Sequence, residues 1–187
     1  MANPLCKQAQ QTLGGMVRIG KIVAKGSPVT LAFSSIPQGY TDLKIIFIGR
    51  DTATGSTDLA VRIKINGDAT SGNYQASQLV YNNTATTAVG ITVAASSAGA
   101  DIARAPGTSG QANAMGAADI LLPGYSGITF FKPIISNSLE FSGNAVVIFN
   151  MSIKSVWKST APITDIVLTA GGTAFVDGTT ATLYGLG

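Results

Sequence analysis

Hydrophobic and polar residues alternate strictly over residues 59–65. Leu59, Val61, Ile63 and Ile65 would share one face, and Ala60, Arg62 and Lys64 the other. This two-residue period is typical of a β-strand with one buried face. The segment ends at Asn66-Gly67-Asp68, and Asn-Gly is a strong signal for a tight hairpin turn. We therefore predict a strand that ends in a turn.

Short segments of similar composition recur along the chain. They span residues 17–24, 29–33, 43–48, 117–122, 132–135, 146–157, 163–169 and 182–184, with a further short strand at Ile91 and Val93. Residues 43–48 are apolar on both faces, which predicts a central strand covered on both sides. In the segment 146–157, Trp157 is in phase with Phe149, Met151 and Ile153, so we expect it in the core.

These segments predict an all-β fold. About nine or ten short strands at roughly even spacing, with no helix long enough to cross over, favour an antiparallel sandwich or barrel. We predict an antiparallel jelly-roll β-sandwich with an extended N-terminal arm. The arm would comprise residues 1–25 and the single sandwich domain residues 26–187. Residues 82–118 are mostly Ala, Thr, Ser, Gly and Asn, and we expect them to form an exposed, variable loop region.

The low proportion of charged residues favours a protein that assembles with other molecules over a monomer. Of the 187 residues, 45% are hydrophobic and only 11% are charged, against about 25% charged in ordinary soluble domains. Weak charge leaves little repulsion between neighbouring molecules. A monomer coated with Ser, Thr and Asn is the alternative interpretation.

Several features indicate the cellular setting. The N-terminus lacks the apolar core of a signal peptide, and no apolar run approaches the roughly 18 residues of a membrane helix. The single Cys6 cannot form an internal disulfide. We therefore expect synthesis in a reducing host cytoplasm and no membrane partner.

The positive charge is concentrated at the N-terminus. Residues 1–25 contain four basic side chains and no acidic one, whereas the remaining residues contain 8 basic and 9 acidic side chains. No aromatic residue lies between the basic residues, so the stacking platform of single-strand binders is missing and we expect no nucleic-acid partner. We expect the arm to dock on a protein surface. Its candidate docking residues are Leu5, Lys7, Leu13, Met16, Val17, Arg18, Lys21 and Lys25.

The chain has no histidine, which removes the commonest general base and metal ligand. With one Cys, zinc sites and thiolate–imidazole pairs are also excluded. Two-carboxylate catalysis stays formally open. The nine carboxylates are Asp42, Asp51, Asp58, Asp68, Asp101, Asp119, Glu140, Asp165 and Asp177. Most of these Asp residues lie beside turn residues at strand ends, so we predict no catalytic residue, no metal site, no cofactor and no enzymatic activity.

Three further motifs have ordinary explanations. Residues 15–21 match the phosphate-loop pattern, but Ile22 replaces its hydroxyl residue and the context is a strand. Asn66-Gly67-Asp68 could offer oxygens to calcium, although a hairpin turn is the simpler interpretation. A sugar-binding platform could be formed by Trp157, Tyr74, Tyr125 and Tyr184. Because Trp157 is in phase with the apolar face of its strand, packing in the core is the simpler interpretation.

Three blocks of sequence resemble a family of small virion proteins of tailed bacteriophages. The first runs from Phe33-Ser-Ser-Ile36-Pro37-Gln38-Gly-Tyr40-Thr41-Asp42-Leu43 through Gly49-Arg50 to Ile65-Asn66-Gly67-Asp68 and Asn73-Tyr74. The second runs from Asp119-Ile120 through Pro123-Gly124-Tyr125 to Lys132-Pro133. The third runs from Trp157-Lys-Ser-Thr160-Ala161-Pro162-Ile163-Thr164-Asp165-Ile166 to Leu183-Tyr184-Gly185. Residues 82–118 align with nothing in the family.

The resemblance implies a jelly-roll virion component without enzymatic activity. We expect a capsid decoration (cement) protein that binds the major capsid protein on the outer surface of the head as a homotrimer. The alternative is a tail fibre or baseplate protein that binds a host surface glycan through residues 82–118 and exposed tyrosines. A carboxylate-based glycan hydrolase is a third possibility.

Overall fold

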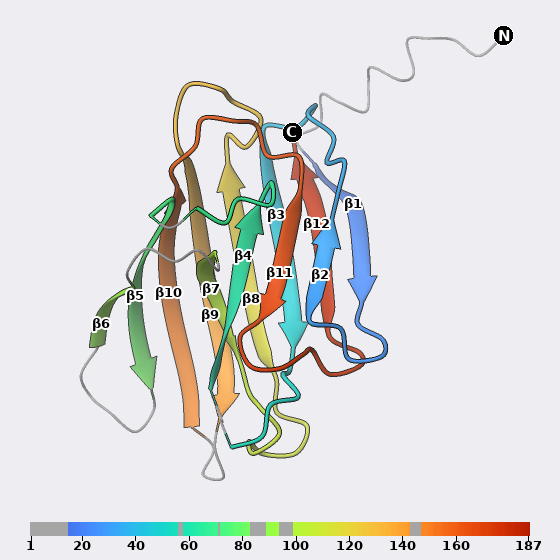
Figure 1. Cartoon of the computed structure of the whole chain (residues 1–187), viewed down its shortest axis with the longest axis vertical. Coiled ribbons are helices and arrows are strands. Elements are labelled where there is room, and N and C mark those ends of the chain that lie inside the picture. The colour runs from blue at the N-terminus through green and yellow to red at the C-terminus, as the bar shows by residue number, and fades with distance from the viewer. Residues whose placement is uncertain (1–14, 56–57, 71, 83–88, 94–98, 143–146) are drawn as a thin grey trace, which may run out of the picture.

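The computed structural model describes residues 15–55, 58–70, 72–82, 89–93, 99–142 and 147–187. In these residues the protein has twelve strands and no helix. The strands form two sheets that lie face to face (Figure 1). None of the described segments is a helix that is long and apolar enough to cross a membrane.

The strand order of the two sheets interleaves segments that are far apart in sequence. In space, the eight-stranded sheet runs β1 (Met16–Val23), β12 (Thr180–Leu186), β3 (Asp42–Gly49), β8 (Gly116–Pro123), β9 (Lys132–Ser142), β10 (Val147–Trp157), β5 (Tyr74–Asn82) and β6 (Val89–Val93). The four-stranded sheet runs β2 (Thr30–Phe33), β11 (Ile166–Ala170), β4 (Leu59–Ile65) and β7 (Ala100–Ala105). Every pairing between these strands is antiparallel. The prediction of an all-β fold with two antiparallel sheets is confirmed.

The hydrophobic core fills the space between the two sheets. On β3, Leu43, Ile45 and Phe47 are fully buried, and the Phe47 ring lies 5.8 Å from that of Phe175. Full burial of each such side chain contributes about 1.5–3 kcal/mol to stability. Trp157 is buried in the same core, as its phase predicted.

The turn after β4 also follows the prediction. Asn66 and Gly67 both have positive φ, at 50° and 67°, and the amide of Asp68 donates to the carbonyl oxygen of Ile65 at 2.9 Å. Two consecutive positive φ angles define the tight hairpin geometry that Asn-Gly favours.

The region 82–118 differs from the exposed loop that we expected. Residues 100–105 form β7, whose side chains are mostly buried because they are small enough to pack against the large sheet. The contact is so close that a Cβ atom on Gly116 would lie 1.9 Å from the carbonyl oxygen of Arg104. The strand β5 was also not predicted, since Ser, Gln and Ala interrupt its apolar pattern.

Strand β3 is central, as predicted, but it is not covered on both sides. Its outer face carries Lys44, Ile46 and Ile48, and Ile48 is 42% exposed. No described segment packs over this outer face, because the small sheet packs against the inner face of the large sheet. The large sheet therefore presents apolar side chains to the surroundings.

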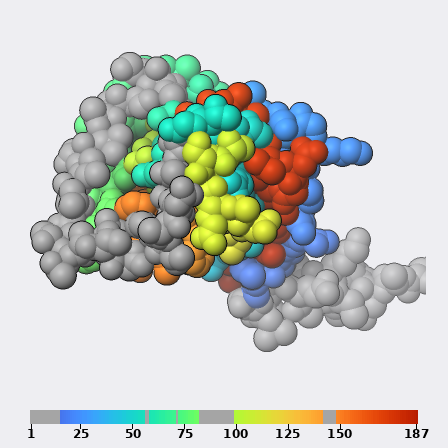
Figure 2. Space-filling view, turned by 90° about the horizontal axis from the view of Figure 1, so that it is seen from below, coloured from blue at the N-terminus to red at the C-terminus, as the bar shows by residue number. Residues whose placement is uncertain are grey.

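One end of the sandwich is closed by loops around residues 50, 110 and 175, which meet in Figure 2. The Arg50 guanidinium donates to the carbonyl oxygens of Gly107, Gly110, Gln111 and Ala114 at 2.7–3.4 Å. The buried Asp51 carboxylate accepts from the amides of Ala53, Gly172 and Thr173 at 2.8–3.1 Å. Both charged side chains fix loops and have a structural role.

Candidate interaction surfaces

A loop at the other end of the sandwich exposes large hydrophobic side chains. Residues 126–131, which we call the apolar loop, connect β8 to β9 at the upper end of the molecule in Figure 1. Ile128 is 73% exposed, Phe130 79% and Phe131 54%. Single exposed hydrophobic residues are normal on proteins, but a cluster of three marks an interaction site.

Buried polar contacts hold the apolar loop in place. Lys132 is 2% exposed, and its Nζ donates to the carbonyl oxygens of Gly127, Phe130 (3.1 Å) and Thr160 (3.5 Å). Among the residues that the structure describes, no carboxylate forms an ion pair with this amine, and burial lowers its pKa. The contacts with Gly127 and Phe130 fix the loop on the Lys132 amine, and the contact with Thr160 links it to the segment between β10 and β11.

Tyr125 secures the other side of the same loop. Its ring is fully buried, and its hydroxyl donates to the carbonyl oxygen of Pro37. Its own carbonyl oxygen accepts from the amide of Ile163 at 2.9 Å. The loop therefore has fixed contacts at both ends, and its hydrophobic side chains point outward from an ordered support.

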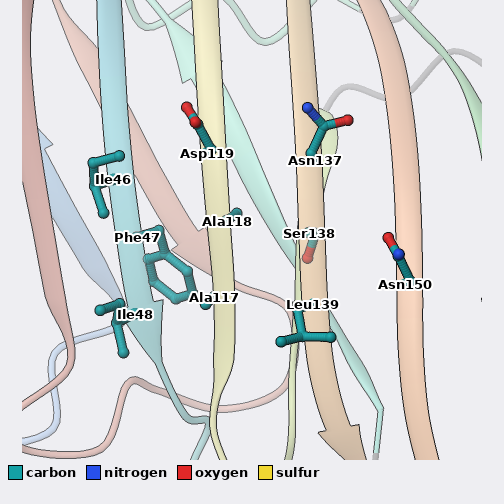
Figure 3. A pocket seen from close by; sticks show the side chains of 10 residues that line it. All are labelled: Ile46, Phe47, Ile48, Ala117, Ala118, Asp119, Asn137, Ser138, Leu139 and Asn150. Carbon is teal, nitrogen blue, oxygen red and sulfur yellow. The ribbon is translucent and has the colours of Figure 1, made fainter.

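A groove crosses the outer face of the large sheet over β3, β8, β9 and β10 (Figure 3). Its volume is about 470 Å³. Ile46 and Ile48 line one side, Leu139 lies on the other, and Ala117 lies between them. We call this feature the outer groove.

The groove follows from the strand register. Ile48 pairs with Ala117, and Ala117 pairs with Leu139, so a methyl group stands between two long aliphatic side chains. Because residues that pair directly across neighbouring strands point to the same face, and Ile48 and Leu139 are exposed, all three lie on the outer face. A short side chain between two long ones leaves a depression.

The polar groups of the groove are few. Asp119, Asn137 and Asn150 line it beside the aliphatic side chains. Asp119 forms an ion pair with Lys44 across 2.8 Å, with half of its own side chain exposed. An exposed pair of this kind contributes little to stability, but it leaves the groove electrically balanced.

The predicted docking arm lies partly outside the described residues. Leu5, Lys7 and Leu13 fall in residues 1–14, as does Cys6, and residues 16–23 form β1 at the edge of the large sheet. Met16 and Val17 are 54% and 48% exposed. The basic residues Arg18, Lys21 and Lys25 are exposed as well. The carboxyl-terminal part of the predicted arm is thus a strand paired with β12, and its docking role stays a prediction.

Charged side chains of β4, of β7 and of the residue before β4 form a cluster. Arg62 Nε contacts Asp101 Oδ1 at 3.1 Å, and Arg104 lies 3.6 Å from Asp58 and 3.9 Å from Asp101. Gln78 Nε2 donates to Asp101 at 3.2 Å. The cluster joins β4, β5 and β7 where the two sheets meet.

Glu140 faces this cluster from β9. Its side chain is fully buried and lies next to the side chain of Asp58. Burial, followed by the neighbouring Asp58 carboxylate, raises the pKa of Glu140 to about 9, which Arg104 opposes. The group is therefore protonated at neutral pH.

Several of the nine carboxylates have structural contacts. Glu140 and Asp58 are neighbours, but a fully buried Glu140 offers no surface for a substrate. Asp68 accepts from the indole of Trp157 at 2.7 Å, from Asn73 at 2.8 Å and from the amide of Thr70 at 2.8 Å. Asp42 accepts from the amide of Gly124 at 2.8 Å. Asp68 and Asp42 therefore have structural roles in the turns that they contact.

In the described part of the chain, Asn66 of the turn motif and three of the four aromatic residues have structural roles. The Asn66 side-chain oxygen accepts from the amides of Thr164 and Asp165 at 2.9 and 3.0 Å, so a metal would compete with both. No group of three acidic, Cys or His side chains there could hold a metal ion. Tyr74, Tyr125 and Trp157 are buried and form no exposed platform.

No protein-family model and no curated protein sequence matches this chain. The likeness to phage virion proteins thus depends on the three blocks of sequence alone.

Sequence reasoning missed the residues with the clearest surface roles. The sequence did contain a signal for the apolar loop, because hydrophobic residues follow the turn residues Pro123-Gly124 and precede β9. These residues are Ile128, Phe130 and Phe131, and a hydrophobic run in a connection between two strands indicates exposed apolar side chains. The outer groove had a weaker signal. Only the two-faced apolar pattern of residues 43–48 indicated that something covers the outer side of β3.

Proposed function

We propose that this chain is a non-enzymatic structural protein of a bacteriophage virion. Its specific role is that of a capsid decoration protein, which binds the major capsid protein on the outer surface of the head as a homotrimer. The observation that supports this most is the apolar loop, in which a buried lysine holds three exposed hydrophobic residues in place. Hydrophobic surface with an ordered support favours binding, since little conformational entropy is lost on docking.

The strand order supports a jelly-roll fold as part of this proposal. The strands β1, β12, β3 and β8 are adjacent in one sheet, and β2, β11, β4 and β7 form the other. Two facing groups of four antiparallel strands with these long crossings fit an eight-stranded double Greek key. In that scheme, β5–β6 and β9–β10 are two insertions that widen one sheet.

The decoration would stabilise the head by physical contact alone. Residues 16–23 remain in the sandwich as β1, and residues 1–14 of each subunit cross neighbouring capsid subunits while the sandwich body remains outside. Ordering the arm costs roughly 1–2 kcal/mol per residue, which apolar contacts must exceed. Its basic residues steer the encounter.

Immunogold labelling tests the location. An antibody raised against the recombinant protein is applied to intact particles of the phage that encodes it. Many labels over the head are expected. Labels confined to the tail would favour the fibre or baseplate alternative and would contradict the decoration role.

A truncation tests the arm. Deleting residues 1–14 removes no described residue, so the truncated protein should keep its melting temperature and oligomeric mass. We expect it to lose binding to undecorated capsids in a sedimentation assay, while the full chain binds. If the truncated protein decorates capsids as well as the full chain, the arm model is wrong.

A further inference from the structure

The apolar loop and the outer groove are complementary features of one chain. The loop is a hydrophobic projection in which Phe130 and Phe131 are the largest exposed side chains. The groove is an aliphatic depression bounded by Ile46, Ile48 and Leu139. We propose that the apolar loop of one copy docks in the outer groove of a second copy. This inference rests on the proposed self-assembly and names the surfaces that carry it.

The two features cannot meet within one molecule. Asp119, at the groove, and Pro123, at the end of β8, are four positions apart along this strand. At about 3.4 Å per residue, the strand carries the chain about 14 Å from the groove before the loop begins. Lys132 and Tyr125 hold the loop at the end of the sandwich. Only the loop of another copy can reach the groove.

The charges of the two surfaces are compatible with close contact. Residues 124–131 contain no charged side chain. In the groove, the Asp119 carboxylate is already paired with Lys44 at 2.8 Å. Docking therefore buries no uncompensated charge, which would otherwise be costly. Asn137 and Asn150, which line the groove, can form hydrogen bonds with backbone groups of the docked loop.

The exposed area favours a broad contact between copies. Aromatic side chains bury about 200 Å² each, so the exposed fractions of Phe130 and Phe131 amount to about 270 Å². A stable interface needs about 800 Å² on each partner. The two rings thus supply about a third of the loop-bearing copy's share, and on the other copy the uncovered face of the large sheet, where Leu79 and Tyr81 are 38% and 49% exposed, widens the receiving surface. The loop is thus the centre of an interface that extends over this sheet.

The contact is heterologous, because it joins two different surfaces of the same chain. Heterologous contacts close into rings when the rotation between copies permits it. A ring of three fits the homotrimer of the proposed function.

Site-directed cross-linking tests the contact. In full-length protein carrying Cys6→Ser, Phe130→Cys and Ala117→Cys are made as two separately tagged variants. After co-expression, a short bismaleimide should link the two tags, whereas either variant alone should give no cross-link. Gln111→Cys, at the opposite end of the molecule, is the matched control and should not link to Phe130→Cys.

Light scattering gives a second readout. The wild type should have an oligomeric mass, and the variant with Phe130→Ser and Phe131→Ser should have the 19.0 kDa mass of one chain with an unchanged melting temperature. Thr129→Ala, in the same loop, should leave the assembly intact.

The outcomes separate this inference from the proposed function. An oligomeric wild type without a Phe130–Ala117 cross-link overturns the docking contact and leaves the virion role standing. A wild type that is monomeric at all concentrations also overturns it, and capsid sedimentation then decides the virion role separately. A cross-link with no capsid binding supports the contact and contradicts the decoration role.

Discussion

The indole nitrogen of Trp157 donates a hydrogen bond to Asp68 Oδ2 across 2.7 Å and so joins the end of β10 to the turn after β4. This bond, with those from Asn73 and the Thr70 amide, lowers the pKa of the Asp68 carboxyl well below its usual range. The same carboxylate thus stabilises the hairpin turn and orients a core side chain.

Asp68→Asn should destabilise the protein by about 1–3 kcal/mol at pH 7, because a charge-assisted bond is lost. Since the folded pKa is lowered, the stabilisation by Asp68 is present above about pH 4 and is lost as the pH falls further. Urea denaturation followed by the fluorescence of Trp157, the only tryptophan, measures both effects. Asp119→Asn on the exposed face is the control, with an expected change under about 0.5 kcal/mol. Equal losses in the two variants would contradict the assigned role.

Glu140 predicts the opposite pH dependence at higher pH. Its folded pKa of about 9 lies above that of the unfolded chain, so the unfolded state releases the proton first. Stability should fall from about pH 5 to pH 9, by up to about 1.4 kcal/mol per pH unit, and then level off. Glu140→Gln, which keeps the shape and stays neutral, should remove this component. Urea denaturation midpoints of the wild type and of Glu140→Gln are measured from pH 5 to pH 9. If both midpoints change with pH in the same way, Glu140 is not the group responsible.

Lys132→Met should destabilise the protein by about 1–3 kcal/mol, because it leaves carbonyl oxygens of Gly127 and Phe130 without their donor. Cleavage by chymotrypsin after Phe130 or Phe131 should become faster in native protein, since the apolar loop loses its tether. Lys154→Met, an exposed change on β10, should alter neither property. Unchanged cleavage in Lys132→Met would show that the amine does not order the loop.

Gly116→Ala should destabilise the sandwich by about 2–3 kcal/mol or prevent folding, because the added Cβ would lie 1.9 Å from the carbonyl oxygen of Arg104. Gly39→Ala is the matched control, since a Cβ there meets nothing within 4 Å. Thermal denaturation of both variants measures the difference. A Gly116→Ala protein as stable as the control would mean that β7 and β8 lie farther apart.

Most of the strands could be predicted because their side chains alternate in a way that a half-buried sheet requires. Residues 59–65 and 146–157 show this pattern most clearly, and Trp157 is buried where its phase placed it. The strand β7 escaped prediction because its buried side chains are mainly alanine, which looks like loop composition in a sequence. Its burial depends on the close approach of the large sheet, which is a tertiary contact.

The surface features were harder to predict for a related reason. A segment such as residues 43–48, which apart from Lys44 is apolar on both faces, indicates burial on both sides, but the sequence does not say whether the same chain provides the cover. The structure leaves Ile46 and Ile48 uncovered. Lys132 is equally invisible in the sequence, because a lysine is normally expected at the surface.

The pairing of β5 with β10 has a consequence for the architecture. The segment between β4 and β7 supplies β5, and the segment between β8 and β11 supplies β10, so two separate excursions of the chain form one common extension of the sheet. Shortening either excursion alone would remove the partner strand from one edge of the other along nine consecutive residue pairs. The two excursions should therefore be gained, exchanged or trimmed together, and a chimera that swaps only one of them would leave an open strand prone to aggregation.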